Sequence, residues 1–129
     1  MRILLALTIA LLSPLCRAAI DTSPSRWGKE IAAFEASDRT NPPPAGVVVF
    51  TGSSSIRFWE SHNAFPELPI INRGFGGSEI SDVLFYYDQV ISKYDPSVIV
   101  FYAGDNDIAD HKPAGQVFAD YTNLTTRIL

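Results

Sequence analysis

Three continuous apolar runs, each followed by a loop of glycine and small polar residues, constrain the fold of this chain more than any other feature. The runs cover residues 46–51, 70–72 and 98–103, and valine, isoleucine and phenylalanine dominate them. Strands buried on both faces of a parallel sheet have this unbroken apolar character. Strands with one solvent-exposed face instead alternate apolar and polar residues. We therefore expect three buried strands in one parallel sheet.

Segments with helical character lie before, between and after these runs. Apolar residues recur at helical spacing from residue 27 to about residue 37. A second helix is expected to begin at about Glu79, with Ser78 as its candidate cap, and Pro113 can open a third. Strict alternation of strand and helix predicts an α/β fold, a three-layer α/β/α flavodoxin-like parallel sheet. Ligands of such sheets bind beyond the carboxyl ends of the strands.

The first 18 residues have the layout of a secretory signal peptide. Met1 and Arg2 give a basic start, residues 3–12 form an apolar run, and small residues allow cleavage after Ala18. The run is too short to span a membrane as a helix. Two alternatives are a buried N-terminal helix and a lipoprotein signal that ends at Cys16. The main prediction is a secreted or periplasmic protein with a mature domain over residues 19–129.

Charge and cysteine content narrow the class of function. Cleavage would remove two of the 10 Lys and Arg residues, so 8 basic residues would face 14 acidic ones, a net charge of −6. That balance, without a basic cluster, argues against a nucleic-acid partner. The only cysteine would leave with the signal peptide, so the mature chain would have neither a disulfide nor a thiol nucleophile. No cofactor is indicated, and the mature protein is expected to have no membrane span.

The loop after the first apolar run reads Gly52-Ser53-Ser54-Ser55. A serine in the turn between a strand and a helix presents its hydroxyl, together with a backbone N–H, at the rim of the sheet. Glycine permits the tight turn there. Taken alone, the same residues also fit a helix cap or an anion-binding loop.

The loops after the other two runs also contain glycines and polar side chains that can form a site. Residues 74–78 read Gly-Phe-Gly-Gly-Ser, which brings the backbone close to a neighbour but lacks the spacing of a dinucleotide site. Residues 104–107 read Gly-Asp-Asn-Asp, which fits a turn with an Asx cap or a cation loop, although it falls short of the Ca²⁺-loop pattern. The side chain of Asn106 can also serve as an oxyanion donor.

In order and spacing, these three loops together resemble the blocks of the SGNH, or GDSL-type, hydrolase superfamily. The resemblance runs from about Trp27 to Ile108. It implies an esterase or acylhydrolase with Ser54 as nucleophile, and an oxyanion hole that includes the N–H of Gly77 and the side-chain amide of Asn106.

Two positions of the first block depart from the family pattern. Ser53 stands where the family has aspartate, and Ser55 stands where it has leucine or isoleucine. With three serines in a row, Ser55 is the next choice for the nucleophile. The replaced aspartate is not credited with the chemistry itself, so its loss does not argue strongly against activity.

The block that supplies the base of this family, Asp-x-x-His, does not occur in the 129 residues. His62 is expected to lie away from the rim of the sheet. His111 is expected on the same side of the sheet as Ser54, but it matches no block of the family. The resemblance implies a fold truncated after the third strand and the helix that follows it. We therefore expect little or no turnover from this chain alone. We also expect an apolar open edge at residues 98–102, which predicts poor solubility or dimerisation.

Two classes of function remain open. The first is an exported enzyme that hydrolyses O-acyl esters of a carbohydrate, a lipid or a small molecule. The second is a non-catalytic module that binds an acyl or sugar ligand on the same fold. A phosphate-binding, flavodoxin-like protein is a weaker third reading, because it explains neither Asn106 nor Gly77.

Overall fold

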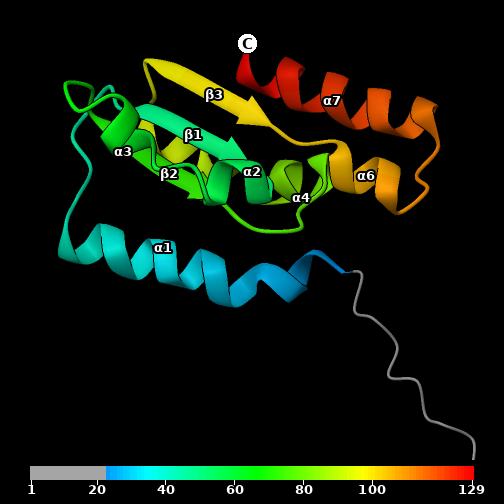
Figure 1. Cartoon of the computed structure of the whole chain (residues 1–129), viewed down its shortest axis with the longest axis horizontal. Helices are drawn as coiled ribbons and strands as arrows, with labels where there is room; N and C mark the ends of the chain where they lie inside the picture. The colour runs from blue at the N-terminus through cyan, green and yellow to red at the C-terminus, as the bar shows by residue number, and fades with distance from the viewer. Residues whose placement is uncertain (1–22) are drawn as a thin grey trace, which may run out of the picture.

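The computed structural model describes residues 23–129, so the predicted signal peptide lies outside the described residues. Three parallel strands form one sheet: β1 (Val48–Gly52), β2 (Ile70–Gly74) and β3 (Val98–Tyr102). Their order is β2-β1-β3 (Figure 1). This confirms the prediction of a parallel α/β sheet built from the three apolar runs.

The register of the sheet aligns the ends of its strands. Gly52, the last residue of β1, lies opposite Gly74 on one side and Tyr102 on the other. In Figure 1 the three arrowheads point toward the same end of the sheet, where α2 (Ser54–Arg57), α4 (Ile80–Phe85) and α6 (Asp105–Ala109) lie. The three loops singled out in the sequence therefore leave the sheet at one edge.

The helices alternate with the strands, as the sequence predicts, but several are short. Two 3₁₀ turns, η1 (Pro24–Trp27) and η2 (Ser92–Tyr94), accompany them. The seven α-helices of the described residues are α1 (Gly28–Thr40), α2 (Ser54–Arg57), α3 (Ser61–Ala64), α4 (Ile80–Phe85), α5 (Tyr87–Val90), α6 (Asp105–Ala109) and α7 (Ala114–Ile128).

The second predicted helix differs from expectation in two respects. It consists of two helices, α4 and α5, which meet at Tyr86; the hydroxyl of this residue donates to the carbonyl of Pro24. The N-cap of α4 is Glu79, and the prediction of Ser78 as the cap is wrong. The Ser78 hydroxyl donates instead to the carbonyl of Gly52, 3.2 Å away, because the neighbouring loop lies within its reach.

Apolar side chains pack on both faces of the sheet. One cluster joins α1, α4 and α7 and is centred on buried Phe75, Val83 and Leu124. The cluster on the other face surrounds Phe50 and Ile56, where the rings of Trp59 and Phe65 pack around Phe50. The core therefore has two sides, with the sheet between them.

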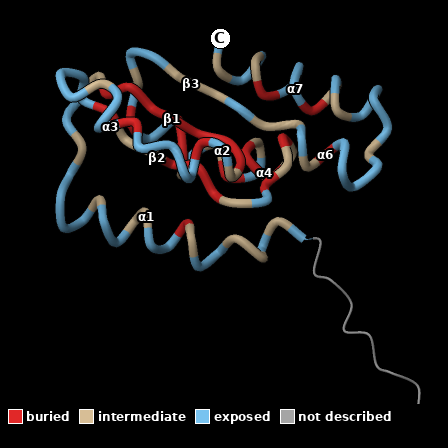
Figure 2. The backbone as a smooth tube through the Cα atoms, in the orientation of Figure 1, coloured by how far each residue is buried: buried red, intermediate tan, exposed pale blue. Residues whose placement is uncertain are grey.

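The strands differ in how far they are covered. β1 is buried along its whole length, whereas residues of β3 are half-buried or exposed (Figure 2). Val98 and Tyr102 at the ends of β3 are 52% and 49% exposed. The apolar edge expected from the sequence is thus present, and the aggregation that it implies stays a prediction. Within residues 23–129, no helix is both long and apolar enough to span a membrane.

A partly buried ion cluster ties α1 to the sheet. Its members, which we call the Asp38 cluster, are Asp38, Arg73, Lys93 and Tyr94. The Asp38 carboxylate pairs with the guanidinium of Arg73 and with Lys93 Nζ at 2.7 Å, and it accepts the Tyr94 hydroxyl at 2.7 Å. Arg73 Nε donates to the same hydroxyl oxygen. Burial alone raises the pKa of Asp38, but hydrogen bonds from Lys93 and Tyr94 and the charge of Arg73 bring the net pKa below its ordinary value.

Candidate active site

Ser54 is the first residue of α2 and follows β1 by a single residue, Ser53. The three adjacent serines lie in different environments, because Ser53 is fully buried, Ser54 is half-buried and Ser55 is exposed. The first residues of a helix have N–H groups without intrahelical acceptors. Ser54 therefore combines a partly accessible hydroxyl with a backbone N–H that the helix does not use.

Gly52 permits this turn because no side chain fits at its position. Its φ of +133° is rare for other residues, and a Cβ there would lie 1.9 Å from the carbonyl oxygen of Tyr102. The next residue reinforces the contact between β1 and β3. The N–H of Ser53 donates to the same carbonyl at 2.9 Å, and its hydroxyl donates to Asp105 at 3.1 Å. The first loop is thereby attached to the third.

The second loop lies against the first. A Cβ built on Gly76 would be 3.9 Å from the Cβ of Ser54. Gly77 follows in a left-handed conformation with φ +79°, and the Trp27 ring lies 3.3 Å from where its Cβ would be. Any side chain at this position would be strained by the backbone and crowded by the indole, so the sequence needs glycine here.

The third loop contacts the second through Asn106. Gly104, at φ +114°, is the N-cap of α6, and Asn106 lies in the first turn of that helix. Asn106 Nδ2 donates to the carbonyl of Ser78 at 2.9 Å. A carboxamide has two N–H donors, so one remains without an acceptor among the described residues.

The three loops thus form one connected rim. The second loop contacts the first through the hydrogen bond from Ser78 to the carbonyl of Gly52. Asn106 of the third loop contacts Ser78 of the second, and Asp105 of the third contacts Ser53 of the first. Sequence reasoning placed Ser54, Gly77 and Asn106 together on this rim, and the structure places their loops in mutual contact.

The sequence analysis did not find the ion cluster behind this rim. Lys112 Nζ lies 2.6 Å from Glu79, 2.8 Å from Asp107 and 3.1 Å from Asp120. It also donates to the hydroxyl of Ser81 at 3.0 Å. We call these five residues the Lys112 cluster. One ammonium group thus joins the start of α4, helix α6 and helix α7.

Asp107 connects this cluster to the loops of the rim. It has no solvent exposure, and its second carboxylate oxygen accepts the N–H of Ile80 at 3.1 Å. Burial alone lowers the pKa of Lys112, but its hydrogen bonds to Asp107, Glu79 and Asp120 raise the net pKa well above its ordinary value. Lys112 therefore stays charged and holds the helices after the second and third loops in one arrangement.

Asn72 was predicted only as the end of a strand, yet it supports helix α2, which begins at Ser54. Its side-chain amide donates to the carbonyl of Ile56 at 2.6 Å and to that of Trp59 at 3.2 Å. Its oxygen accepts the N–H of Gly74 at 2.9 Å. The end of α2 is thereby fixed to β2. The only sequence signal for this role was an asparagine at the end of an apolar strand, and that signal is weak.

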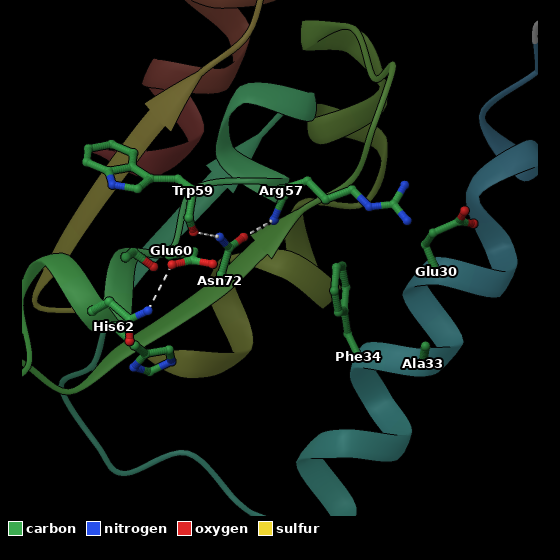
Figure 3. Close-up of a pocket in the computed structure, with 11 residues that line it drawn as sticks. Glu30, Ala33, Phe34, Arg57, Trp59, Glu60, His62 and Asn72 are labelled. Carbon is green, nitrogen blue, oxygen red and sulfur yellow. Dashed lines mark hydrogen bonds between the residues drawn. The ribbon is translucent and has the colours of Figure 1, made fainter.

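The two histidines lie at different places. His62 belongs to α3 and lines a pocket next to α1 (Figure 3). His111 follows α6 with φ +60° and lines a groove with Asp105 and Tyr102, on the side of the rim. Among residues 23–129, no group of three His, Cys, Asp or Glu side chains is placed to hold a metal ion.

Comparison with known proteins identifies the fold. One solved structure, from Streptococcus pneumonia and named for platelet activating factor, matches with a TM-score of 0.68 and 19% identity over 78% of this chain. A structure from Bacteroides fragilis named as an acylhydrolase matches with a TM-score of 0.58 and 23% identity over 79%. A GDSL-like lipase from Bacteroides thetaiotaomicron matches with a TM-score of 0.59 and 23% identity over 81%.

The chain has the fold of GDSL-type hydrolases. The alignments cover 47%, 50% and 51% of the three solved chains, so this chain spans about half of their length. No protein-family model and no curated protein matches the sequence. At these identities the likeness to GDSL-type hydrolases is one of fold.

Proposed function

We propose that this chain is the nucleophile-bearing part of an exported serine esterase or acylhydrolase of the SGNH, or GDSL, type. Ser54 attacks the carbonyl carbon of an ester. The N–H groups of Ser54 and Gly77 and the free amide hydrogen of Asn106 stabilise the oxyanion that forms. The tetrahedral intermediate collapses, the alcohol leaves with a proton, and an acyl-serine remains. Water then hydrolyses this ester, which releases the carboxylic acid and regenerates the serine. The observation that carries this proposal is the mutual contact of the three loops at one rim.

The base that activates Ser54 is proposed to come from an Asp-x-x-His segment, which the 129 residues do not contain. Loss of the histidine lowers the rate of a serine hydrolase by about 10⁶, whereas loss of one oxyanion donor lowers it by about 10²–10³. The isolated chain is therefore expected to hydrolyse p-nitrophenyl acetate no faster than its Ser54→Ala variant. Hydrolysis that disappears in Ser54→Ala would overturn this expectation.

Export rests on the first 18 residues, whose basic start, apolar run and small residues fit a cleavable signal. Expression of the reading frame with its own N-terminus, followed by N-terminal sequencing of the exported product, tests this. Ala19 as the first residue supports the proposal, and a retained Met1 contradicts it.

The nucleophile is tested in the longest product of the reading frame, treated with a serine-directed fluorophosphonate. Peptide mass spectrometry is expected to find the probe on Ser54. Labelling should vanish in Ser54→Ala and persist in the matched control Ser55→Ala. If a product that contains an Asp-x-x-His segment is not labelled, the non-catalytic binding module replaces the enzyme as the better account.

A further inference from the structure

A pocket beside the rim has no role in the chemistry proposed above. It lies between helix α1, which contributes Glu30 and Phe34, and the segment from α2 to α3, with β2 as its floor (Figure 3). Because β2 and β3 are opposite edges of the sheet, the pocket lies away from the open edge of β3. Its walls come entirely from the described residues.

One wall of this pocket contains a buried hydroxyl group without a partner. Ser61 is 1% exposed and lines the pocket, yet its Oγ makes no hydrogen bond in the described part of the chain. A buried polar atom without a partner is costly, and folded proteins satisfy nearly all such atoms with protein, water or ligand. The Ser61 hydroxyl is therefore left without a protein partner in the wall of the pocket, and a bound molecule would satisfy it through rotation of the side chain.

The charged groups of the pocket have both signs. The Arg57 side chain extends toward Glu30 across the opening, but the two form no ion pair (Figure 3). Glu60 lines the same pocket and accepts a hydrogen bond from Asn63 at 2.9 Å. A carboxylate ligand would meet two like charges here, and an ammonium ligand would meet the guanidinium. Hydroxyl groups both donate and accept, so an uncharged ligand with several hydroxyls fits all of these groups.

The apolar side chains of the pocket can contact the carbon atoms of a ligand. Phe34 and Ala33 of α1 present carbon atoms to the pocket, opposite the polar residues of the α2–α3 segment. Ligand sites combine such apolar surface with a few placed polar groups. A sugar ring presents both kinds of surface, because its C–H faces are apolar and its hydroxyls point outward.

The pocket is adjacent to the proposed nucleophile. Arg57 Nη1 lies 3.0 Å from the position of a Cβ on Gly76, and the Cβ of Ser54 lies 3.9 Å from the same point. Arg57 thus connects the pocket to the rim. A ligand that contacts Arg57 in the pocket therefore lies close to the glycine loop that flanks Ser54.

We propose that this pocket binds an uncharged, hydroxyl-rich ligand of the sugar class, and that the ligand is the alcohol part of the ester. The binding claim concerns the pocket alone, and the claim about the ester rests on the function proposed above. Ser61, Arg57 and Glu30 provide the polar contacts, and Phe34 contacts one face of the ring.

The test is an NMR titration of the ¹⁵N-labelled 129-residue protein with methyl β-D-glucoside and methyl β-D-xyloside. Saturable shifts are expected at the amides of Phe34, Ser61 and Asn63. Two charged sugars serve as controls: glucuronate carries one negative charge, and glucosamine carries one positive charge. Both should bind more weakly than the neutral glycosides. Preference for either charged sugar, or no saturable shift with either neutral glycoside up to its solubility, would overturn the proposal.

Ser61→Ala separates binding from folding. It removes a buried group without a partner, so thermal stability should stay unchanged or rise, while sugar affinity should fall roughly threefold to tenfold. Ser55→Ala, an exposed serine outside the pocket, is the control and should change neither. Unchanged affinity in Ser61→Ala would contradict the proposal.

Ser54→Ala distinguishes the two proposals. Sugar binding should survive in this variant, because Ser54 does not line the pocket. Fluorophosphonate labelling that persists in Ser54→Ala, with intact sugar binding, would reject the nucleophile and keep the binding site. Labelling that vanishes in Ser54→Ala, without sugar binding to the unmodified chain, would reject the binding site alone.

Discussion

The two ion clusters of this molecule are built from similar groups but lie in different places. In the Lys112 cluster one ammonium is shared by three carboxylates, and it joins α4, α6 and α7 behind the rim. In the Asp38 cluster one carboxylate is shared by two cations and a tyrosine hydroxyl, and it joins α1 to β2 and η2. Damage to the first should therefore alter the candidate site, whereas damage to the second should alter stability alone.

The largest effect is expected from Lys112→Met. Removal of the ammonium leaves the fully buried Asp107 without its cation, and breaking a buried pair in this way costs about 3–5 kcal/mol. Urea unfolding of the 129-residue chain would measure the loss, and the ¹⁵N spectrum should show the side-chain amide of Asn106 shifted. Lys112→Arg should restore part of the stability. A loss below about 1 kcal/mol would show that the cluster does not support the rim.

Asp38→Asn should have a smaller effect, because Arg73 keeps its contacts with the Tyr94 hydroxyl and the carbonyl of Asn72. We expect a loss of about 2–3 kcal/mol, the value of a charged hydrogen bond, measured by the same unfolding experiment. The Asn106 amide resonances should not move. A shift of these resonances comparable to that in Lys112→Met would break the contrast between the two clusters.

The Asp38 cluster should also give stability an acid dependence. The folded state lowers the pKa of Asp38 below its ordinary 3.8, so the contribution is complete above that value and is lost as pH falls through the lowered pKa. Unfolding free energies measured at decreasing pH should therefore fall less steeply for Asp38→Asn than for the unmodified chain. Equal slopes would show that another carboxylate carries the acid dependence.

The smallest effect is expected at the surface. Arg127 and Asp88 pair at 2.9 Å, but their side chains are 43% and 68% exposed. An exposed pair contributes about 0–1 kcal/mol, so Asp88→Asn should barely change the unfolding free energy. This variant is the control for the substitutions in both clusters. A loss as large as that of Asp38→Asn would show that burial does not distinguish these pairs.

The sequence was sufficient for the parts of the fold that depend on local pattern. Unbroken apolar runs placed the three strands, and the small residues after them placed Ser54 at a turn between a strand and a helix. Helix α6 was not predicted, because its residues 105–107 also fit a turn. Ser78 was misassigned as a cap, because its partner Gly52 lies 26 residues away in the sequence.

The Lys112 cluster could not be predicted for the same reason. Lys112 has partners 33 residues before it and 8 residues after it, and nothing in the local pattern separates it from an exposed lysine. Asn72 likewise acts through carbonyls of another segment. Local periodicity reports which face of an element is buried, but contacts between loops depend on the assembled sheet.

The proposed oxyanion hole depends most directly on how Ser54 faces the other two loops. Nuclear Overhauser contacts in the ¹⁵N- and ¹³C-labelled 129-residue chain measure this without any substrate. We expect cross-peaks from the Ser54 β-protons to the backbone N–H of Gly76 or Gly77, and from the Asn106 side-chain amide to residues of the same loop. Ser54 protons that contact neither loop would contradict the proposed oxyanion hole and the hydrolase assignment with it.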